Sequence, residues 1–365
     1  MAVGIIGGGG AMPLEVGLRS GAALLLLYSW MKIGSDSIKR RGRPPGPPGW
    51  PIVGNMFDLG TSPHQTFYKL RAEYGPVLWL KLGFVNTMVI QSAYSAAELF
   101  KNHDLSFSDR KATESLTALG YNESALAVCE YGAYWRRLRR LYTIELFASK
   151  RIQESAPLRE KCIDKMVRWI EEDSITSRAQ GGSGEVKLVK YLFLMAFNMV
   201  GNLMFSRDLL QMQSNEGDEF FEAMNKFMEW AMKPNVADFF PFLKWLDPQR
   251  IKRNMARDMG RCMKIITGLV DERVQEKQLG RDDVKNDFLD VLLAYESDGK
   301  EGPHKLSEST VNIIILEMFF GGSETTTSTI EWVMTELLRN PRSMKKVKDE
   351  LDQAVGPNVK VKESD

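Results

Sequence analysis

The chain has 365 residues, of which 44% are hydrophobic and 26% are charged, so it can bury a large core. Its 48 basic and 47 acidic side chains leave a formal net charge of +1, which gives no electrostatic reason to expect a nucleic-acid partner. The three cysteines and the three histidines are widely spaced, so we expect a reducing compartment, no disulfide framework and no metal site built from these side chains.

Residues 1–43 differ in character from the rest and are expected to form a membrane anchor with a basic flank. The apolar run Gly21–Met31 has 11 residues, fewer than the roughly 18–20 that cross a bilayer unaided. Five cations follow this run, as the positive-inside rule requires of a cytosolic flank. A signal peptide and an interfacial helix are the alternatives, although no convincing A-x-A cleavage site follows the run.

Residues 44–51, PPGPPGWP, form a proline-rich hinge. Five prolines fix φ and predict a semi-rigid polyproline spacer, which would hold residues 52–365 at a set angle to a membrane.

The next segments predict a helix followed by a β-hairpin. Ser62-Pro63 opens the helix, and Gly75-Pro76 ends it. Strands are expected at Val77–Leu82 and Thr87–Gln91, joined by Gly83–Asn86. Helical patterns then follow at 93–102, 134–146, 150–173, 187–206, 217–232, 247–278, 286–298, 307–339 and 341–354. The predicted class is mostly α with a small N-terminal β element.

The segment 307–339 contains two apolar stretches that flank nine residues, 321–329, without an apolar side chain. These nine could form a flexible loop, but the register favours one continuous helix. One face continues in steps of 4 and 3 through Leu316, Phe320, Ser323, Thr327, Ile330, Met334 and Leu337. Ser307 is a good N-cap, and no stop signal occurs before Asn340-Pro341. The Gly, Ser and Thr residues cost on the order of 5 kcal/mol in a helix, so we expect polar groups and close approach there.

Trp135 and Arg139 are four residues apart in a predicted helix and therefore share one face. The guanidinium fork and the indole N–H could hold an anionic group together. The alternative is a basic helix face exposed to solvent.

Taken together, PPGPPGWPIVGN, the Trp135–Arg139 pair and the Gly321–Thr326 stretch GGSETT resemble a microsomal cytochrome P-450. The family patterns are a proline hinge, W-x-x-x-R and A/G-G-x-D/E-T-T/S. The stretches YGPVLWLKLG, ELFKNHDLSFSDR and EMFFGGSETT resemble plant enzymes that act on terpenoids, alkaloids or phenolics. The resemblance runs from the anchor to Asp365, with the first 12 residues atypical.

The resemblance implies a monooxygenase with heme b that inserts one oxygen atom from O2 into a small apolar substrate. Because no flavin or nicotinamide motif is present, electrons would come from a separate NADPH-cytochrome reductase. The location implied is the endoplasmic reticulum membrane, with the catalytic domain on the cytosolic side. Substrate selectivity would fall to residues 104–128, to 207–245 and to Phe319–Phe320.

The resemblance also implies roles for particular residues. Trp135 and Arg139 would bind the heme propionates, with Arg110 as a further candidate. Gly321 would let heme and O2 approach the long helix closely.

Thr325 would hydrogen-bond near the bound O2 and help to deliver protons, and Glu324 would be the adjacent acid. The Thr325 hydroxyl can bond back to the Gly321 carbonyl and loosen the helix at this point. The alternative for Glu324 is an exposed or salt-bridged helix residue.

The family's iron ligand is a cysteine in a loop F-x-x-G-x-x-x-C-x-G, and Cys129, Cys162 and Cys262 all lack that setting. The family's E-x-x-R helix is also missing, because the matching Glu336–Arg339 lies inside the long helix. We therefore expect a cytochrome P-450 fold without its C-terminal heme-ligand part, with the cysteine beyond Asp365. The alternative is a truncated, catalytically inactive, membrane-anchored helical protein that cannot ligate heme iron.

Overall fold

The computed structural model describes residues 42–210, 215–280, 287–296, 305–356 and 359–363. These residues divide into two compact units. Unit 1 contains the described residues up to Phe107 together with Phe239–Phe242, and unit 2 contains Ser108–Asp238 and the residues from Leu243 onward. The expected anchor lies almost entirely in residues 1–41, outside the described residues.

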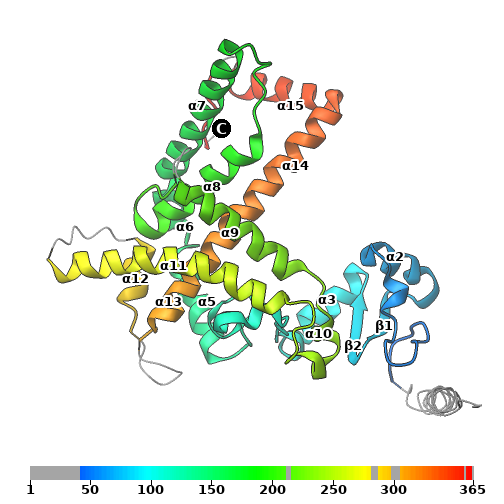
Figure 1. Ribbon diagram of the computed structural model, residues 1–365. Helices are drawn as coiled ribbons and strands as arrows, with labels where there is room; N and C mark the ends of the chain where they lie inside the picture. Colours follow the sequence, from blue (N-terminus) through cyan, green and yellow to red (C-terminus); the bar gives the residue numbers. More distant parts are fainter. Residues whose placement is uncertain (1–41, 211–214, 281–286, 297–304, 357–358, 364–365) are drawn as a thin grey trace, which may run out of the picture. The chain divides into compact units, whose positions relative to one another are not determined.

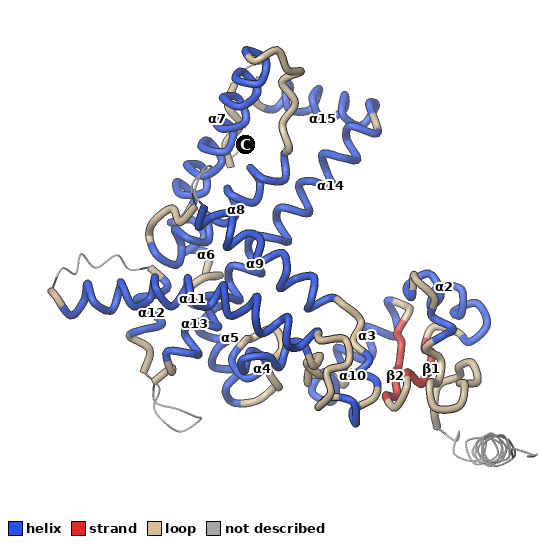
Figure 2. The backbone as a smooth tube through the Cα atoms, in the orientation of Figure 1, coloured by secondary structure: helices blue, strands red, loops and turns tan. Residues whose placement is uncertain are grey.

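Unit 1 is built on the predicted β-hairpin, which Figure 2 shows as two red strands. Strand β1 (Val77–Leu82) pairs antiparallel with β2 (Val85–Ile90), with Leu82 opposite Val85. The turn is Gly83-Phe84, shorter than the predicted Gly83–Asn86. Gly83 has a φ of 57°, and a Cβ there would lie 2.7 Å from the Phe239 carbonyl oxygen. Glycine therefore permits a tight turn that hydrophobic alternation alone does not locate.

Every second residue of β1 is buried, as the alternating pattern predicts. Leu78, Leu80 and Leu82 form a small core, against which Phe67 and Leu70 of the preceding helix pack. The helical elements of this unit are η1 (Phe57–Leu59), α2 (Pro63–Tyr74), α3 (Ala93–Asn102) and η2 (Asp104–Phe107).

The proline-rich segment is docked on this sheet, which differs from the predicted spacer. The carbonyl oxygen of Pro45 accepts a 2.9 Å hydrogen bond from the backbone N–H of Trp79 in β1. A Cβ at Gly46 would lie 1.9 Å from the Trp79 carbonyl oxygen, so only glycine fits there. Proline lacks an N–H but keeps its carbonyl, which allows it to pair along a strand edge.

Unit 2 is helical. The long helix predicted at 307–339 is called the central helix from here on. The elements of unit 2 before it are η3 (Ser115–Gly120), α4 (Tyr121–Ser124), α5 (Ala133–Glu145), α6 (Ser149–Glu154), α7 (Ala156–Ala179), α8 (Leu188–Phe205), α9 (Asn215–Met232), α11 (Ile251–Gln278) and α12 (Phe288–Leu293). The short turns α10 (Val236–Phe239) and η4 (Pro241–Leu243) overlap the Phe239–Phe242 stretch of unit 1. Helix α15 (Pro341–Ala354) follows the central helix.

Three predicted helix bounds were wrong. The helix expected at 150–173 is broken at Ser155 into α6 and α7, because Pro157 cannot donate the backbone hydrogen bond that a continuous helix needs. The helix expected from residue 247 begins at Ile251, because the Asp247 carboxylate accepts from the N–H groups of Lys252 and Arg253. The helix expected at 286–298 is described only as the short α12.

Helix α8 forms the centre of unit 2. Among the described residues, it is the helix long and apolar enough to cross a membrane, and 67% of it is buried within the protein. Burial on nearly all sides explains why its sequence is apolar all round.

The predicted long helix is present. It consists of α13 (Glu308–Phe319), a π turn η5 (Phe320–Glu324) and α14 (Thr325–Arg339), which follow one another in Figure 1. The Ser307 hydroxyl caps it by accepting from the N–H of Thr310 at 3.1 Å. The predicted face is buried through the polar stretch, since Ser323 is 0% and Thr327 is 2% exposed. The continuous helix is therefore confirmed, and the loop alternative is excluded.

Phe319 and Phe320 lie in the core of unit 2, which corrects their expected contribution to substrate selectivity. The Phe319 ring stacks on Phe197 with centroids 4.4 Å apart, and Phe320 stacks on Phe227 at 3.7 Å. Both side chains are buried. Aromatic residues at helical spacing here serve packing.

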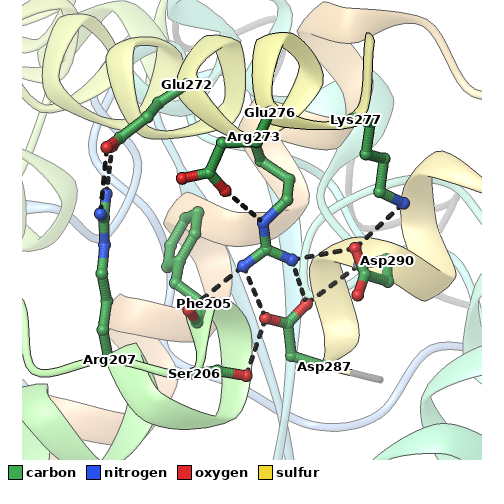
Figure 3. A network of polar contacts seen from close by, with 9 residues as sticks. All are labelled: Phe205, Ser206, Arg207, Glu272, Arg273, Glu276, Lys277, Asp287 and Asp290. Carbon is green, nitrogen blue, oxygen red and sulfur yellow. Dashed lines mark hydrogen bonds and ion pairs between the residues drawn. The ribbon is translucent and has the colours of Figure 1, made fainter. Parts of the chain in front are cut away.

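A buried ion network joins α11, α12 and the end of α8 (Figure 3). The guanidinium of Arg273 contacts both carboxylate oxygens of Asp287 at 3.0 and 2.9 Å and one of Asp290 at 2.9 Å. It also donates to the Phe205 carbonyl oxygen at 3.2 Å. Lys277 contacts Asp290 as well, at 3.0 Å. The Arg273 and Asp287 side chains are 6% and 2% exposed, so this network is part of the core.

Candidate functional site

The central helix opens at the π turn. The Thr325 hydroxyl donates to the Gly321 carbonyl oxygen at 2.7 Å, as predicted. A threonine hydroxyl bonded to the carbonyl four residues earlier weakens the regular ladder, and π turns in α-helices are frequent at functional sites. Gly321 and Thr325 are both exposed, whereas most of α13 is buried. The turn therefore presents a hydroxyl and a loosened backbone on an accessible side of a core helix.

The two glycines of the turn have different surroundings. A Cβ at Gly322 would lie 2.6 Å from Cγ2 of Val200, so packing against α8 accounts for glycine there. A Cβ at Gly321 would meet no atom within 4 Å. Packing within the described residues does not account for glycine at 321, and the open space beside it is available to a ligand.

Replacing each glycine by alanine should separate packing from ligand binding. Gly322→Ala is expected to lower the free energy of unfolding by about 1–3 kcal/mol, because β-branched Val200 cannot move aside freely. Gly321→Ala is expected not to lower it, since alanine is about 1 kcal/mol better than glycine in a helix. Urea unfolding of both variants measures the difference, and an equal loss in both would contradict the assignment of open space at Gly321.

Both glycines line a cavity of about 720 Å³ in unit 2. Leu158 of α7, Val200 of α8 and Met318 of α13 contribute to its wall. This volume falls within the range of about 300–1,000 Å³ that is usual for small-molecule sites.

Two of the predicted propionate-binding residues meet at one short segment. The indole N–H of Trp135 on α5 donates to the carbonyl oxygen of Leu126 at 3.2 Å. A guanidinium nitrogen of Arg110 donates to the carbonyl oxygen of the next residue, Ala127, at 2.9 Å. The structure thus brings Trp135 and Arg110 together, although they are far apart in sequence.

Arg139 lies one turn after Trp135 on α5 and is exposed. Its guanidinium carbon is 5.9 Å from the centroid of the Phe147 ring. The predicted helix that places Trp135 and Arg139 on one face is confirmed, and the guanidinium rests on an aromatic ring outside the Leu126–Ala127 segment.

Glu324 is the last residue of the π turn and is half-buried. One carboxylate oxygen accepts from the Ser328 hydroxyl at 3.4 Å. It therefore lies next to Thr325, as the predicted acid role requires.

Glu317 is a polar residue of the site that the sequence analysis missed. It lies one turn before Gly321 and is 7% exposed. Its carboxylate accepts from the N–H groups of Leu126 and Ala127 at 2.9 and 2.6 Å, and from the Tyr142 hydroxyl at 3.1 Å. Burial raises the pKa of Glu317, while these three hydrogen bonds oppose the rise. The sequence signal that could have identified Glu317 is a carboxylate within an otherwise apolar helical segment.

None of the three cysteines lines the cavity beside Gly321. All three are buried, and burial raises the pKa of Cys129 to about 11 and that of Cys262 to about 12. Burial also raises the pKa of Cys162. Without a bound metal, these thiols are neutral near pH 7. Within the described ranges, no group of three His, Cys, Asp or Glu residues is placed to hold a metal ion.

For a heme, the residues therefore fit in part. The guanidinium groups of Arg110 and Arg139 have N–H donors for propionates, whereas the one indole N–H of Trp135 is bound to Leu126. An exposed glycine and hydroxyl lie on an opened helix. None of the described cysteines lies on the wall of this cavity, so none is placed as an axial ligand there.

The helical fold and the opened central helix agree with the fold class that the sequence predicts. Residues 44–365 match the family model described as Cytochrome P450, and the chain belongs to this family.

The relatives agree with this assignment. The chain is 55% identical over 353 residues to "Iridoid oxidase" of Catharanthus roseus, a match that covers 97% of this chain and 68% of the relative. It is 48% identical to "Cytochrome P450 76A2" of Solanum melongena (94% and 66%) and 34% identical to "Geraniol 8-hydroxylase" of Catharanthus roseus (90% and 64%). The chain thus spans about two thirds of the length of these curated relatives.

Proposed function

We propose that this chain forms the oxygen-side part of a monooxygenase that hydroxylates a small apolar terpenoid with O2. The observation that carries the proposal is the opened helix, in which exposed Gly321 and Thr325 are joined by a 2.7 Å hydrogen bond. The names of the relatives from Catharanthus roseus refer to iridoid oxidation and geraniol hydroxylation, which favours terpenoids over alkaloids and phenolics.

Heme b, bound through a cysteine thiolate that the family resemblance places after Asp365, would supply O2 binding and activation. Trp135, Arg110 and Arg139 would hold its propionates, because indole and guanidinium groups are donors suited to carboxylates. Trp135 and Arg110 donate to adjacent carbonyl oxygens and so lie beside one another. The indole N–H would exchange the Leu126 carbonyl for a propionate, whereas the guanidinium has further N–H groups.

Protons would reach the oxygen side through Thr325 and Glu324. The Thr325 hydroxyl can donate a proton while accepting another, and its position one turn from Gly321 keeps it at the opening. Glu324 beside it would act as the general acid that restores the proton.

The remaining partners follow from the same proposal. Electrons would come from an NADPH-cytochrome reductase, and residues 1–43 would anchor the protein in the endoplasmic reticulum membrane with the catalytic part on the cytosolic side. The basic residues after the apolar run support this orientation.

Oxidation assays test the proposed activity. The test uses a longer chain that includes the family's loop F-x-x-G-x-x-x-C-x-G, called the cysteine loop below. With reductase and NADPH, this chain should hydroxylate members of a terpenoid panel in preference to alkaloids and phenolics. Preference for a phenolic or an alkaloid would overturn the substrate class.

The buried thiols favour a second candidate function for the 365-residue chain alone, which is ligand binding without oxidation. We expect that this chain, reduced and exposed to CO, gives no spectrum of thiolate-ligated heme, because its three cysteines are buried and none lines the cavity beside Gly321. Difference absorbance spectroscopy is the measurement. A thiolate-type spectrum from this chain would show that one of its own cysteines is the ligand.

A further inference from the structure

We propose that Glu317 is a positioning residue of this site: its carboxylate fixes the backbone of Leu126 and Ala127 and thereby the donors of Trp135 and Arg110. Only the identity of the group that those donors bind rests on the proposed function. The fixing of the segment itself follows from the contacts of the buried carboxylate.

The first step concerns the hydrogen bonds that two adjacent backbone N–H groups donate to Glu317. Leu126 and Ala127 follow α4 in a turn, where their N–H groups have no helix or strand to pair with. Both N–H groups donate to Glu317 instead, at 2.9 and 2.6 Å. Hydrogen bonds to a charged acceptor in a buried site are stronger than neutral ones. The conformation of this turn therefore depends on a side chain about 190 positions later.

The second step is the link from the turn to the donors. The N–H of Ala127 and the carbonyl of Leu126 belong to one planar peptide unit. Glu317 binds that N–H, and the Trp135 indole binds that carbonyl, at 3.2 Å. The next carbonyl, of Ala127, accepts from Arg110 at 2.9 Å. A rotation of this peptide plane would move the carbonyl that the indole N–H binds, so the carboxylate fixes the position of the Trp135 side chain.

The third step concerns a direct contact between α5 and Glu317. Tyr142 lies two turns after Trp135 on α5, and its hydroxyl donates to Glu317 at 3.1 Å. Helix α5 is thus attached to α13 directly through Tyr142 and indirectly through Trp135 and the turn. All three partners of Glu317 are donors, which suits a carboxylate rather than a neutral acid. Burial alone would favour the neutral acid and raises the pKa of this group.

The test is amide hydrogen exchange of the 365-residue chain, measured by mass spectrometry. Glu317→Gln keeps the size of the side chain but turns one acceptor into a donor that faces an N–H. Exchange at Leu126 and Ala127 should rise at least about tenfold, because a hydrogen bond to a charged group is lost. Tyr142→Phe leaves both amide bonds and should give a smaller rise, and Glu308→Gln, exposed in the first turn of α13, should give none.

Unchanged exchange at these two amides in Glu317→Gln would overturn the proposal. A uniform rise over α5, α13 and the turn would also overturn it, since that is the result of general core destabilisation. If Glu317→Gln does not fold, Tyr142→Phe still decides, because a local rise confined to the turn is expected only from positioning.

Binding of hemin and of hemin dimethyl ester, followed by heme absorbance, tests the link to the propionates. Glu317→Gln should weaken hemin binding by about tenfold and change binding of the ester much less, because only the free propionates carry the charge that strengthens a hydrogen bond from the Arg110 guanidinium. Adding Trp135→Phe to Glu317→Gln should cause little further loss, as coupled residues are not additive. An equal loss for the ester would overturn the propionate role. Faster exchange with unchanged hemin binding would uphold the positioning and overturn the propionate role.

Discussion

Thr325→Ala, in a chain extended by the cysteine loop, is expected to leave substrate affinity nearly unchanged while diverting reducing equivalents to hydrogen peroxide. The hydroxyl that bonds to Gly321 is the group proposed to pass protons at the opening of the helix. A positioned acid–base group contributes about 10²–10⁴ to a rate, so product formation should fall by at least about a hundredfold. Product, NADPH consumption and peroxide are measured together, so that the coupling of electrons to product is obtained directly.

Two variants control this experiment. Thr325→Ser keeps the hydroxyl and should retain most of the coupling. Thr329→Ala removes a hydroxyl that makes the same kind of bond one turn later, to the Thr325 carbonyl at 2.8 Å, outside the π turn. It should behave as the unmodified chain does. Unchanged coupling in Thr325→Ala would show that its hydroxyl has no part in proton delivery.

Arg273→Met is expected to lower the free energy of unfolding by about 3–5 kcal/mol, the usual cost of removing one partner from a buried ion pair. The substitution keeps the apolar stem but leaves the carboxylate of Asp287 almost without charge compensation in the core. The Ser206 hydroxyl, which donates to Asp287 at 2.9 Å, is a neutral donor and cannot replace the guanidinium. Asp290 still has Lys277. Urea unfolding of both chains gives the difference.

Arg207→Met is the matched control in the same network of Figure 3. Arg207 pairs with Glu272, but their side chains are 40% and 50% exposed. Exposed pairs contribute about 0.2–1 kcal/mol, so this variant should lose no more than that. A loss in Arg273→Met as small as in Arg207→Met would mean that the buried network does not stabilise the fold.

The central helix could be predicted from sequence because its evidence is local. The steps of 4 and 3 from Leu316 to Leu337 define one face, and the bond from Thr325 to Gly321 needs only a spacing of four. The cap at Ser307 is local as well. Each of these features depends on residues within a few turns, so helical periodicity is sufficient.

Other parts of the site depend on distant residues, and periodicity carries no information about them. Glu317 finds its backbone partners about 190 positions earlier, and Arg110 finds Ala127 across an irregular segment. The docking of Pro45 on β1 likewise follows from the sheet edge rather than from the prolines. The expectation that Phe319 contributes to selectivity differs from its stacking on Phe197, because helical spacing does not reveal whether a ring contacts protein or ligand.

Isotope labelling tests most directly whether this chain is part of a monooxygenase. A chain extended by the cysteine loop, supplied with heme, reductase, NADPH and a terpenoid, would be incubated under oxygen-18 gas and its product analysed by mass spectrometry. The proposed function predicts one oxygen-18 atom in each product molecule. Thr325→Ala should yield far less of this labelled product. A product that carries oxygen from water, or no product from a chain that binds both heme and terpenoid, would contradict it.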